Sequence, residues 1–168
     1  MDLEELNETA VRAAARLGAD DAVALSAKSA DSMIRFANNS VSVVNRVEEA
    51  ELSVYLAKDG RRAIASTSNL ELAAVKKFVK DLFGSLKGLP KSEYVPLPGK
   101  SVRYSPSLLG YDRKLEDVDP ELPELAKEAI DSALSSGGKR SAGVISAGKG
   151  TVAIMTSTGT KGSDSRTA

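Results

Sequence analysis

The spacing of apolar residues changes twice in the first half of the chain, and this restricts the fold more than any other feature of the sequence. Between residues 3 and 17 apolar side chains recur at the three- and four-residue spacing of a helix, and Gly18 follows as a stop signal. From Ala22 to Ser66 they recur at every second residue, which is the period of a β-strand. Beyond Asn69, a candidate helix cap, the helical spacing returns. The pattern predicts a helix, a set of strands and a second helix.

Turn signals divide the strand region into consecutive antiparallel strands. Asn38-Asn39 separates two alternating runs, and Asn tolerates the left-handed conformation that a tight turn needs. Asp59-Gly60 is a strong hairpin signal. We therefore expect an antiparallel meander of about four or five strands between residues 22 and 66. The predicted fold class is α+β, an antiparallel β-sheet meander with two or three amphipathic helices packed on one face.

The second half of the chain begins with a segment that has no period. Pro and Gly recur through residues 88–118, which predicts an extended crossing segment. A third helix is predicted with Asp119 as its cap, Pro120 at its first position and Gly137-Gly138 as its stop signal.

Two strand-like runs, 141–146 and 151–157, then flank Gly148-Lys149-Gly150, which predicts a hairpin turn at these glycines. Residues 158–168 have few apolar side chains and are expected to be disordered. The predicted organisation is an amino-terminal α/β domain (1–87), the crossing segment (88–118), a helix plus β-hairpin of the same or an adjoining domain (119–157), and a disordered tail (158–168).

Composition excludes several classes of active site. The chain has no Cys and no His, which removes thiolate nucleophiles, Ser-His-Asp triads and the common zinc ligand sets, so we expect no catalytic, cofactor-binding or metal-binding residue. Lys plus Arg and Asp plus Glu each number 23, so no overall field attracts nucleic acid or an anionic membrane. The amino terminus is acidic and no apolar run approaches about 18 residues, so a soluble, cytoplasmic protein is expected.

One stretch resembles a phosphate-binding loop. Residues 143–149 nearly spell the glycine-rich loop that cradles phosphates at the start of a helix. Gly150 stands where the magnesium-binding Ser or Thr belongs, and a strand-like run follows instead of a helix. A hairpin turn is the better interpretation.

The crossing segment combines cations with aromatic rings, as single-stranded nucleic-acid-binding proteins do. The cations are Lys87, Lys91, Lys100, Arg103, Arg113 and Lys114, and the rings are Tyr94, Tyr104 and Tyr111. Acidic residues in the same segment reduce its net positive charge, and tyrosines also anchor long loops to a domain surface. We therefore favour anchoring of the loop over nucleic-acid binding.

Two smaller clusters are candidate sites. Glu48, Glu49 and Glu51 are close enough in sequence to suggest a cation or acid–base site, but on a strand only 49 and 51 share a face, which favours a solvated rim. Lys58 with Ser66 or Ser68 suggests a Ser-Lys pair, although the hairpin explains Lys58 sufficiently.

A series of short motifs, taken in order, resembles the TldD/PmbA family. The motifs are Leu17-Gly18-Ala19-Asp20-Asp21-Ala22, Ile34-Arg35-Phe36-Ala37-Asn38-Asn39, Lys58-Asp59-Gly60, Ala65-Ser66-Thr67-Ser68-Asn69-Leu70, Tyr111-Asp112-Arg113, Ala126-Lys127-Glu128-Ala129 and Val152-Ala153-Ile154-Met155-Thr156-Ser157-Thr158-Gly159. The resemblance covers nearly the whole chain. The sequence Ala-Ser-Thr-Ser at residues 65–68 is more similar to PmbA/TldE-type members than to TldD-type members.

The resemblance implies a function that this chain does not perform alone. Family members are longer, with an α/β amino-terminal domain and a mainly β carboxy-terminal domain that carries zinc in TldD-type members. The chain then corresponds to the amino-terminal domain only, not catalytic by itself and without a cofactor of its own. Implied partners are a peptide or unfolded protein substrate and a TldD/TldE-type subunit in a homo- or heterodimer. The implied roles are intracellular proteolysis, peptide maturation and modulation of DNA gyrase.

Two hypotheses for the chain follow. An antiparallel meander has exposed strand edges that hold an extended peptide through main-chain hydrogen bonds, so the domain is expected to contribute to peptide binding or subunit pairing. The alternative is a stand-alone binding module for single-stranded nucleic acid, which a salt-dependent affinity would indicate.

Overall fold

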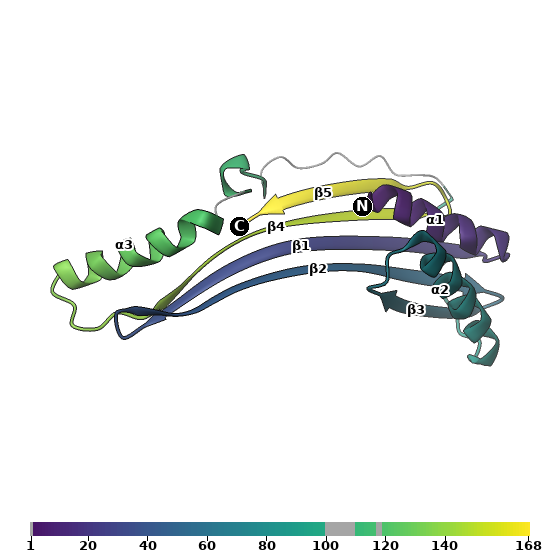
Figure 1. Ribbon diagram of the computed structural model, residues 1–168. Helices are drawn as coiled ribbons and strands as arrows, with labels where there is room; N and C mark the ends of the chain where they lie inside the picture. The colour runs from purple at the N-terminus through teal and green to yellow at the C-terminus, as the bar shows by residue number, and fades with distance from the viewer. Residues whose placement is uncertain (1, 100–109, 117–118) are drawn as a thin grey trace. The chain divides into compact units, whose positions relative to one another are not determined.

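The structure is a computed structural model that describes residues 2–99, 110–116 and 119–168. Its centre is a sheet of five strands in the order β3-β2-β1-β4-β5 (Figure 1). The elements are α1 (Leu3–Arg16), β1 (Asp21–Ala37), β2 (Ser40–Lys58), β3 (Arg61–Thr67), α2 (Leu72–Ser85), η1 (Leu86–Gly88), η3 (Arg113–Leu115), η4 (Asp119–Glu121), α3 (Leu122–Ser135), β4 (Gly143–Thr156) and β5 (Lys161–Thr167). None of the described helices is both long enough and apolar enough to cross a membrane.

Local signals fix the ends of the first helix. The Asp2 side chain accepts a hydrogen bond from the Glu4 N–H at 2.8 Å, which satisfies one of the amide groups left free at a helix start. Gly18 adopts a φ of 84°, and its N–H donates to the Ala15 carbonyl. The predicted first helix and its glycine stop are confirmed.

Positive φ angles produce both tight turns that the sequence indicated. Asn38 and Asn39 have φ of 52° and 65°, and Asp59 and Gly60 have φ of 50° and 76°. Two successive residues with positive φ give the turn whose twist matches an antiparallel strand pair. Leu52 to Lys58 of β2 accordingly pair with Thr67 to Arg61 of β3.

The sheet is antiparallel throughout. The Ser157 N–H, just past the end of β4, donates to the Ala22 carbonyl near the start of β1 at 2.8 Å. The tight connections β1 to β2, β2 to β3 and β4 to β5 reverse the chain between neighbouring strands. The predicted α+β class with an antiparallel sheet and three helices is confirmed.

The described chain forms two compact units. The first unit contains residues 2–28, 50–99 and 151–164, and the second contains 29–49, 110–116, 119–150 and 165–168. Within each unit β1 buries even-numbered side chains, Ala24 in the first and Ile34 in the second, whereas Lys28 between them is exposed. The strand therefore has a packed face in each unit, interrupted near the residues where the units divide.

The core of the first unit lies between the strands and the helices α1 and α2. Its fully buried members include Leu6 and Ala10 of α1, Leu52 and Leu56 of β2, and Val75 of α2. In the second unit, α3 contributes Leu122, Ala126 and Ile130, which pack against Ile34, Phe36 and Ala147. Each helix packs with the apolar stripe that its periodicity predicts.

Several details of the sequence prediction are wrong. Residues 22–66 form three strands, not four or five, because β1 and β2 continue for 17 and 19 residues through polar stretches that keep the alternation. Asn69 does not cap α2, whose cap position is Glu71. Asp119 and Pro120 form a short turn of 3-10 helix, and α3 begins at Leu122.

The end of the chain also differs from expectation. Gly148 and Lys149 lie inside the continuous strand β4, and the turn follows at Gly159, whose φ is 91°. Gly148 is needed for close approach, not for a turn, since a Cβ atom there would collide with the Asp31 side chain. Residues 161–167 of the predicted disordered tail form β5, because pairing with β4 satisfies their backbone groups without apolar side chains.

Candidate functional site

The first unit has a hollow on the sheet face that α1 and α2 leave uncovered. Leu25 of β1, Val152 and Ile154 of β4, and the stretch from Thr160 to Asp164 enclose a volume of about 290 Å³. Leu25, Val152 and Ile154 are 41%, 43% and 38% exposed. We refer to this feature as the sheet-face hollow.

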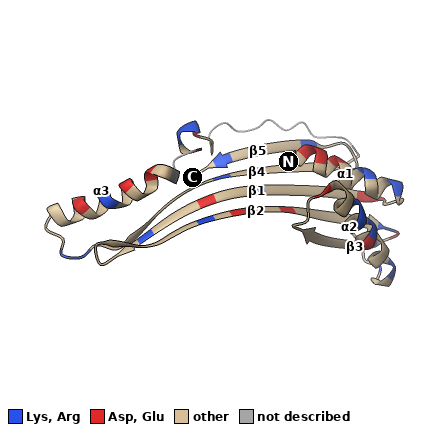
Figure 2. Ribbon diagram, in the orientation of Figure 1, with Lys and Arg blue, Asp and Glu red and all other residues tan. Residues whose placement is uncertain are grey.

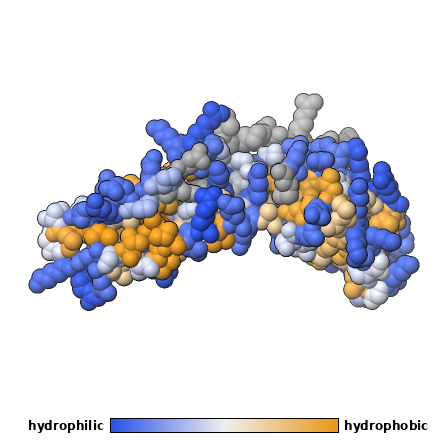
Figure 3. Space-filling view, viewed as in Figure 1, coloured by the Kyte–Doolittle hydropathy of each residue, from blue (hydrophilic) through white to orange (hydrophobic). Residues whose placement is uncertain are grey.

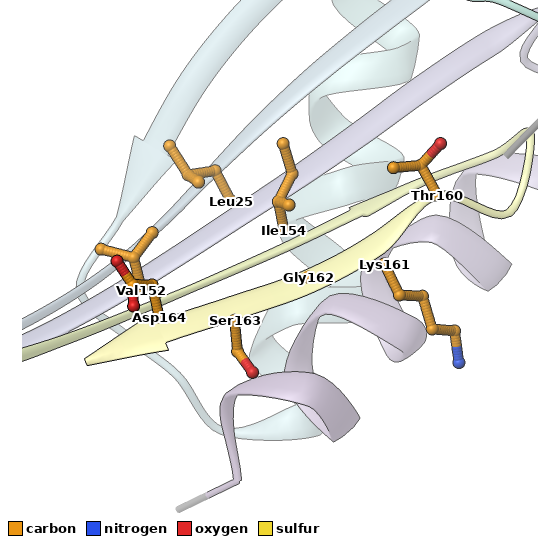
Figure 4. A pocket seen from close by; sticks show the side chains of 8 residues that line it. All are labelled: Leu25, Val152, Ile154, Thr160, Lys161, Gly162, Ser163 and Asp164. Carbon is orange, nitrogen blue, oxygen red and sulfur yellow. The ribbon is translucent and has the colours of Figure 1, made fainter. Parts of the chain in front are cut away.

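Strand alternation explains which side chains line the hollow. Figure 4 shows Leu25 and Ile154 rising from their strands, while Lys161 and Ser163 point the opposite way, towards α1. The Ser163 hydroxyl lies 3.4 Å from a Glu4 carboxylate oxygen on that side. Gly162 has no side chain, which leaves room for another backbone or an inserted group.

The chemistry of the hollow is that of a binding surface. Aliphatic side chains form its floor, and Thr160 and Asp164 supply polar groups around it. Such a site can bury an apolar side chain of a ligand, whereas it offers no nucleophile activated by a base. Apolar burial stabilises a bound side chain by roughly 1.5–3 kcal/mol when it is complete.

A strap of chain, residues 89–97, packs against the end of the sheet in the same unit. The Arg61 side chain donates to the Leu89 carbonyl at 2.9 Å, and the Ser92 N–H donates to the Gly60 carbonyl at 2.8 Å. Further along, the Leu97 N–H donates to the Asp21 carboxylate at 3.3 Å. These contacts fix the strap to the β2–β3 turn and the start of β1.

Charged groups are concentrated beside the strap. The Lys58 ammonium lies 2.7 Å from Asp20 Oδ1, and this contact, together with the Asp59 N–H, lowers the pKa of Asp20. The same hydrogen bond raises the pKa of Lys58. Burial, followed by the charges of Asp21 and Asp20, raises the pKa of the Tyr94 phenol. Both tyrosine and carboxylate therefore hold their ordinary charge states at neutral pH.

A comparison with known protein families finds a match in the amino-terminal part of the chain. Residues 22–85 match the family described as PmbA/TldA metallopeptidase domain 1. The match begins in β1 and ends with α2, so it covers three strands and the second helix. Residues 22–85 are therefore similar to the first domain of the PmbA/TldA family.

Solved structures have the same fold over nearly the whole chain. A Bacteroides thetaiotaomicron protein described as a modulator of DNA gyrase superposes with a TM-score of 0.84 at 23% identity and covers 98% of this chain. TldE from Thermococcus kodakarensis gives 0.78 at 18% identity over 96%. A Thermotoga maritima protein, also described as a modulator of DNA gyrase, gives 0.76 at 16% identity over 99%.

This chain spans only part of the length of these structures. It covers 38%, 36% and 38% of the Bacteroides, Thermococcus and Thermotoga chains. A search of curated proteins finds no significant match to the sequence.

The phosphate-loop resemblance of residues 143–149 does not correspond to a phosphate-binding loop in the structure. Its glycines and Lys149 belong to β4 and not to a loop that leads into a helix. The Gly148 N–H instead donates to the Ala168 carbonyl at 2.8 Å, and Lys149 Nζ donates to the Glu116 carbonyl at 3.1 Å. The predicted hairpin turn at this position is also wrong.

The cations and rings of the crossing segment divide between the two units. Lys87, Lys91 and Tyr94 belong to the first unit, and Tyr111, Arg113 and Lys114 belong to the second. The Lys91 side chain packs 3.8 Å from where a Cβ of Gly60 would lie, and Tyr94 is half-buried beside the acidic pair Asp20 and Asp21. Lys100, Arg103 and Tyr104 lie outside the described residues. The described part of the segment thus anchors the chain to the sheet.

The two remaining clusters have structural partners. Glu48 pairs with Arg46 at 2.7 Å, Glu51 accepts from the Ser53 hydroxyl, and no group of three potential metal ligands occurs among the described residues. Lys58 contacts Asp20, and the Ser66 hydroxyl lies 2.8 Å from that of Ser53. No contact joins Lys58 to Ser66 or Ser68 in the described chain.

Sequence reasoning missed the sheet-face hollow. Leu25, Val152 and Ile154 are recognisable in the sequence only as members of alternating runs, with no sign of which face the helices would cover. A usable signal was the glycine in the polar run Lys161-Gly162-Ser163, since glycine in a strand marks close approach of another group.

Proposed function

We propose that this chain is a non-catalytic part of a PmbA/TldA-type peptidase system and that its sheet-face hollow binds an apolar side chain of an extended peptide. The observation that carries the proposal is the hollow itself, formed by exposed aliphatic side chains beside the edge strand β5. The match of residues 22–85 to a metallopeptidase family supports the peptidase context. The absence of His and Cys from the chain agrees with a binding role, since the usual nucleophile–base pairs need them.

An extended peptide suits this surface because its side chains alternate as those of a strand do. Every second side chain of the peptide then faces the sheet, and one of them occupies the hollow over Ile154 and Leu25. Main-chain hydrogen bonds to a sheet edge add affinity that does not depend on the peptide sequence. The combination gives broad specificity with a preference for one apolar residue.

Subunit pairing is a second role that a separate observation favours. In the second unit, β2 carries four exposed valines: Val41, Val43, Val44 and Val47. Val41, Val43 and Val47 project from one face of the strand, and Val44, which is 70% exposed, projects from the other. Apolar surface is visible within both units (Figure 3). Neighbouring exposed apolar side chains on one face, such as the first three valines, mark protein interaction surfaces.

A peptide-binding titration tests the hollow. A labelled unstructured peptide rich in Leu and Thr is titrated with the wild-type chain, with Ile154→Asp and with the control Ile64→Asp. Ile64 is 72% exposed on β3 and does not line the hollow, so the control makes the same chemical change on the same unit. Ile154→Asp is expected to weaken binding roughly tenfold, which corresponds to about 1.4 kcal/mol of lost apolar contact.

The outcomes separate the two roles. Equal binding by wild type and Ile154→Asp would show that the hollow does not hold the peptide. If the wild-type chain binds no peptide but forms dimers in sedimentation velocity, the result would contradict the peptide-binding role and support the subunit-pairing role. Circular dichroism of each variant establishes that the fold is intact before either comparison.

A further inference from the structure

The helical layer of the first unit contains a groove lined by cations. Arg12 and Arg16 of α1 face Lys76 and Lys80 of α2 across a volume of about 350 Å³, with Ala13 and Leu17 on its floor. Figure 2 shows the basic residues, in blue, on the later part of α1 and on α2, whereas the start of α1 is acidic. We refer to this feature as the interhelical groove.

Helix periodicity places these four side chains together. Arg12 and Arg16 are four residues apart, as are Lys76 and Lys80, so each pair forms a stripe along one side of its helix. The neighbouring residues Val75 and Val79 are fully buried and hold α2 against the core that α1 shares. The two helices that form the groove are therefore held together by the core of the unit.

The cations of the groove exceed the acidic groups that contact them. Glu8 forms an ion pair with Arg12 one turn away. Among the described residues, no carboxylate is in ion-pair contact with Arg16, Lys76 or Lys80. Lys77 shows the contrast, because it is not part of the groove lining and is paired with Asp81 at 2.6 Å. Packing like charges together is unfavourable in isolation, so the arrangement suits an anionic ligand.

We propose that the interhelical groove binds an acidic, partly apolar peptide segment of a partner protein. Guanidinium groups bind carboxylates through two parallel hydrogen bonds, and the two lysines add mobile charges on the facing wall. Ala13 and Leu17, the latter 36% exposed, offer apolar contact between the cations. None of the described residues that line the groove is aromatic, so they do not form the stacking platform that single-stranded nucleic acid uses.

This proposal is independent of the peptide role of the sheet-face hollow. The groove belongs to the helices that cover one face of the sheet, and the hollow lies on the face that they leave uncovered. A variant of one surface leaves the residues of the other unchanged. The two sites also differ in salt dependence, because exposed charges are screened over about 8–10 Å at physiological ionic strength.

Fluorescence anisotropy tests the groove with defined probes. A labelled Glu-rich peptide with interspersed Leu, a Lys-rich peptide of equal length and an oligothymidylate of equal charge are titrated with the 168-residue chain at low and raised salt. The test variant is Arg16→Ala with Lys80→Ala. The control is Lys28→Ala with Lys87→Ala, which removes the same charge from exposed positions of the same unit outside the groove.

The acidic peptide is expected to bind, to lose affinity at raised salt, and to bind the test variant about tenfold more weakly. The control is expected to bind within about twofold of wild type. If the test and control variants lost the same amount of affinity for the acidic peptide, general charge attraction would explain the binding, and the proposal would be overturned. Absence of binding, or tighter binding of the oligothymidylate than of the acidic peptide, would overturn it as well.

Discussion

The buried side chain of Asn7 provides a sharp test of how α1 is fixed to the sheet. Asn7 is 1% exposed, and its Nδ2 donates a hydrogen bond to the Ala153 carbonyl of β4 at 2.8 Å. Its Oδ1 is buried with no hydrogen-bond partner among the described residues. Asn7→Asp keeps the size of the side chain but replaces the N–H donor with an oxygen, so two acceptors then face each other.

The expected cost follows from these contacts. Breaking the buried hydrogen bond and leaving an unpaired charge in its place together cost about 3–5 kcal/mol. The free energy of unfolding of Asn7→Asp is therefore expected to fall by about 3–5 kcal/mol at neutral pH. That is a large share of the roughly 5–15 kcal/mol that stabilises an ordinary domain.

Acidification is expected to restore part of this stability. Burial raises the folded-state pKa of the introduced carboxyl above its unfolded value of about 3.9. The penalty is then absent below the unfolded pKa, grows as the pH rises between the two values, and is complete above the folded pKa. When protonated, the carboxyl also regains a donor for the Ala153 carbonyl.

Urea denaturation followed by far-UV circular dichroism at several pH values measures both effects. Asn69→Asp is the matched control, because Asn69 is exposed and uses only its oxygen, which accepts from the Glu71 N–H at 3.4 Å. The control is expected to stay within about 0.5 kcal/mol of wild type. If Asn7→Asp were as stable as the control at neutral pH, the buried hydrogen bond between Asn7 and Ala153 would be refuted.

Two further predictions concern packing and pH. Gly143→Ala is expected to cost about 1–3 kcal/mol in urea denaturation, since the new Cβ would lie 2.6 Å from the ring of Phe36 in the second core. Gly84→Ala, which meets no atom within 4 Å in α2, is expected to be neutral or stabilising, and equal losses at both glycines would contradict the packing argument. Because contact with Lys58 lowers the pKa of Asp20, that pair contributes stability above the unfolded pKa of Asp20 and loses it as the pH falls through the lowered folded value. Asp20→Asn is therefore expected to flatten the acid limb of the stability profile slightly, and an unchanged profile would show that this exposed pair contributes nothing.

The two proposed surfaces differ in how their ligands are selected. In the two proposals, the sheet-face hollow is expected to select one apolar side chain, because aliphatic side chains line it, and the interhelical groove is expected to select negative charge, because cations line it. For each surface, the binding of a variant within it is compared both with that of the wild-type chain and with that of a control variant outside it.

The sequence by itself determined the elements that depend on local preferences. The period of the apolar residues established α1, α2 and the alternating strands, because a helix and a strand place side chains at different repeats. Asn38-Asn39 and Asp59-Gly60 established the tight turns, because few other residues adopt a positive φ at low cost. The lack of His and Cys excluded the common catalytic centres through composition alone, because those centres need imidazole or thiolate groups.

Only the tertiary structure decided which backbone groups pair and which faces remain open. Gly148 has the sequence context of a turn residue but lies within β4, where the glycine is needed because the Asp31 side chain, from a distant part of the sequence, approaches it closely. Residues 161–167 lack apolar side chains, yet they form β5, since β4 supplies the hydrogen bonds that a polar segment cannot make alone. The hollow at Ile154 and the groove at Arg16 likewise arise from elements that folding brings together. Contact between two distant segments leaves no periodic signal in the sequence of either segment.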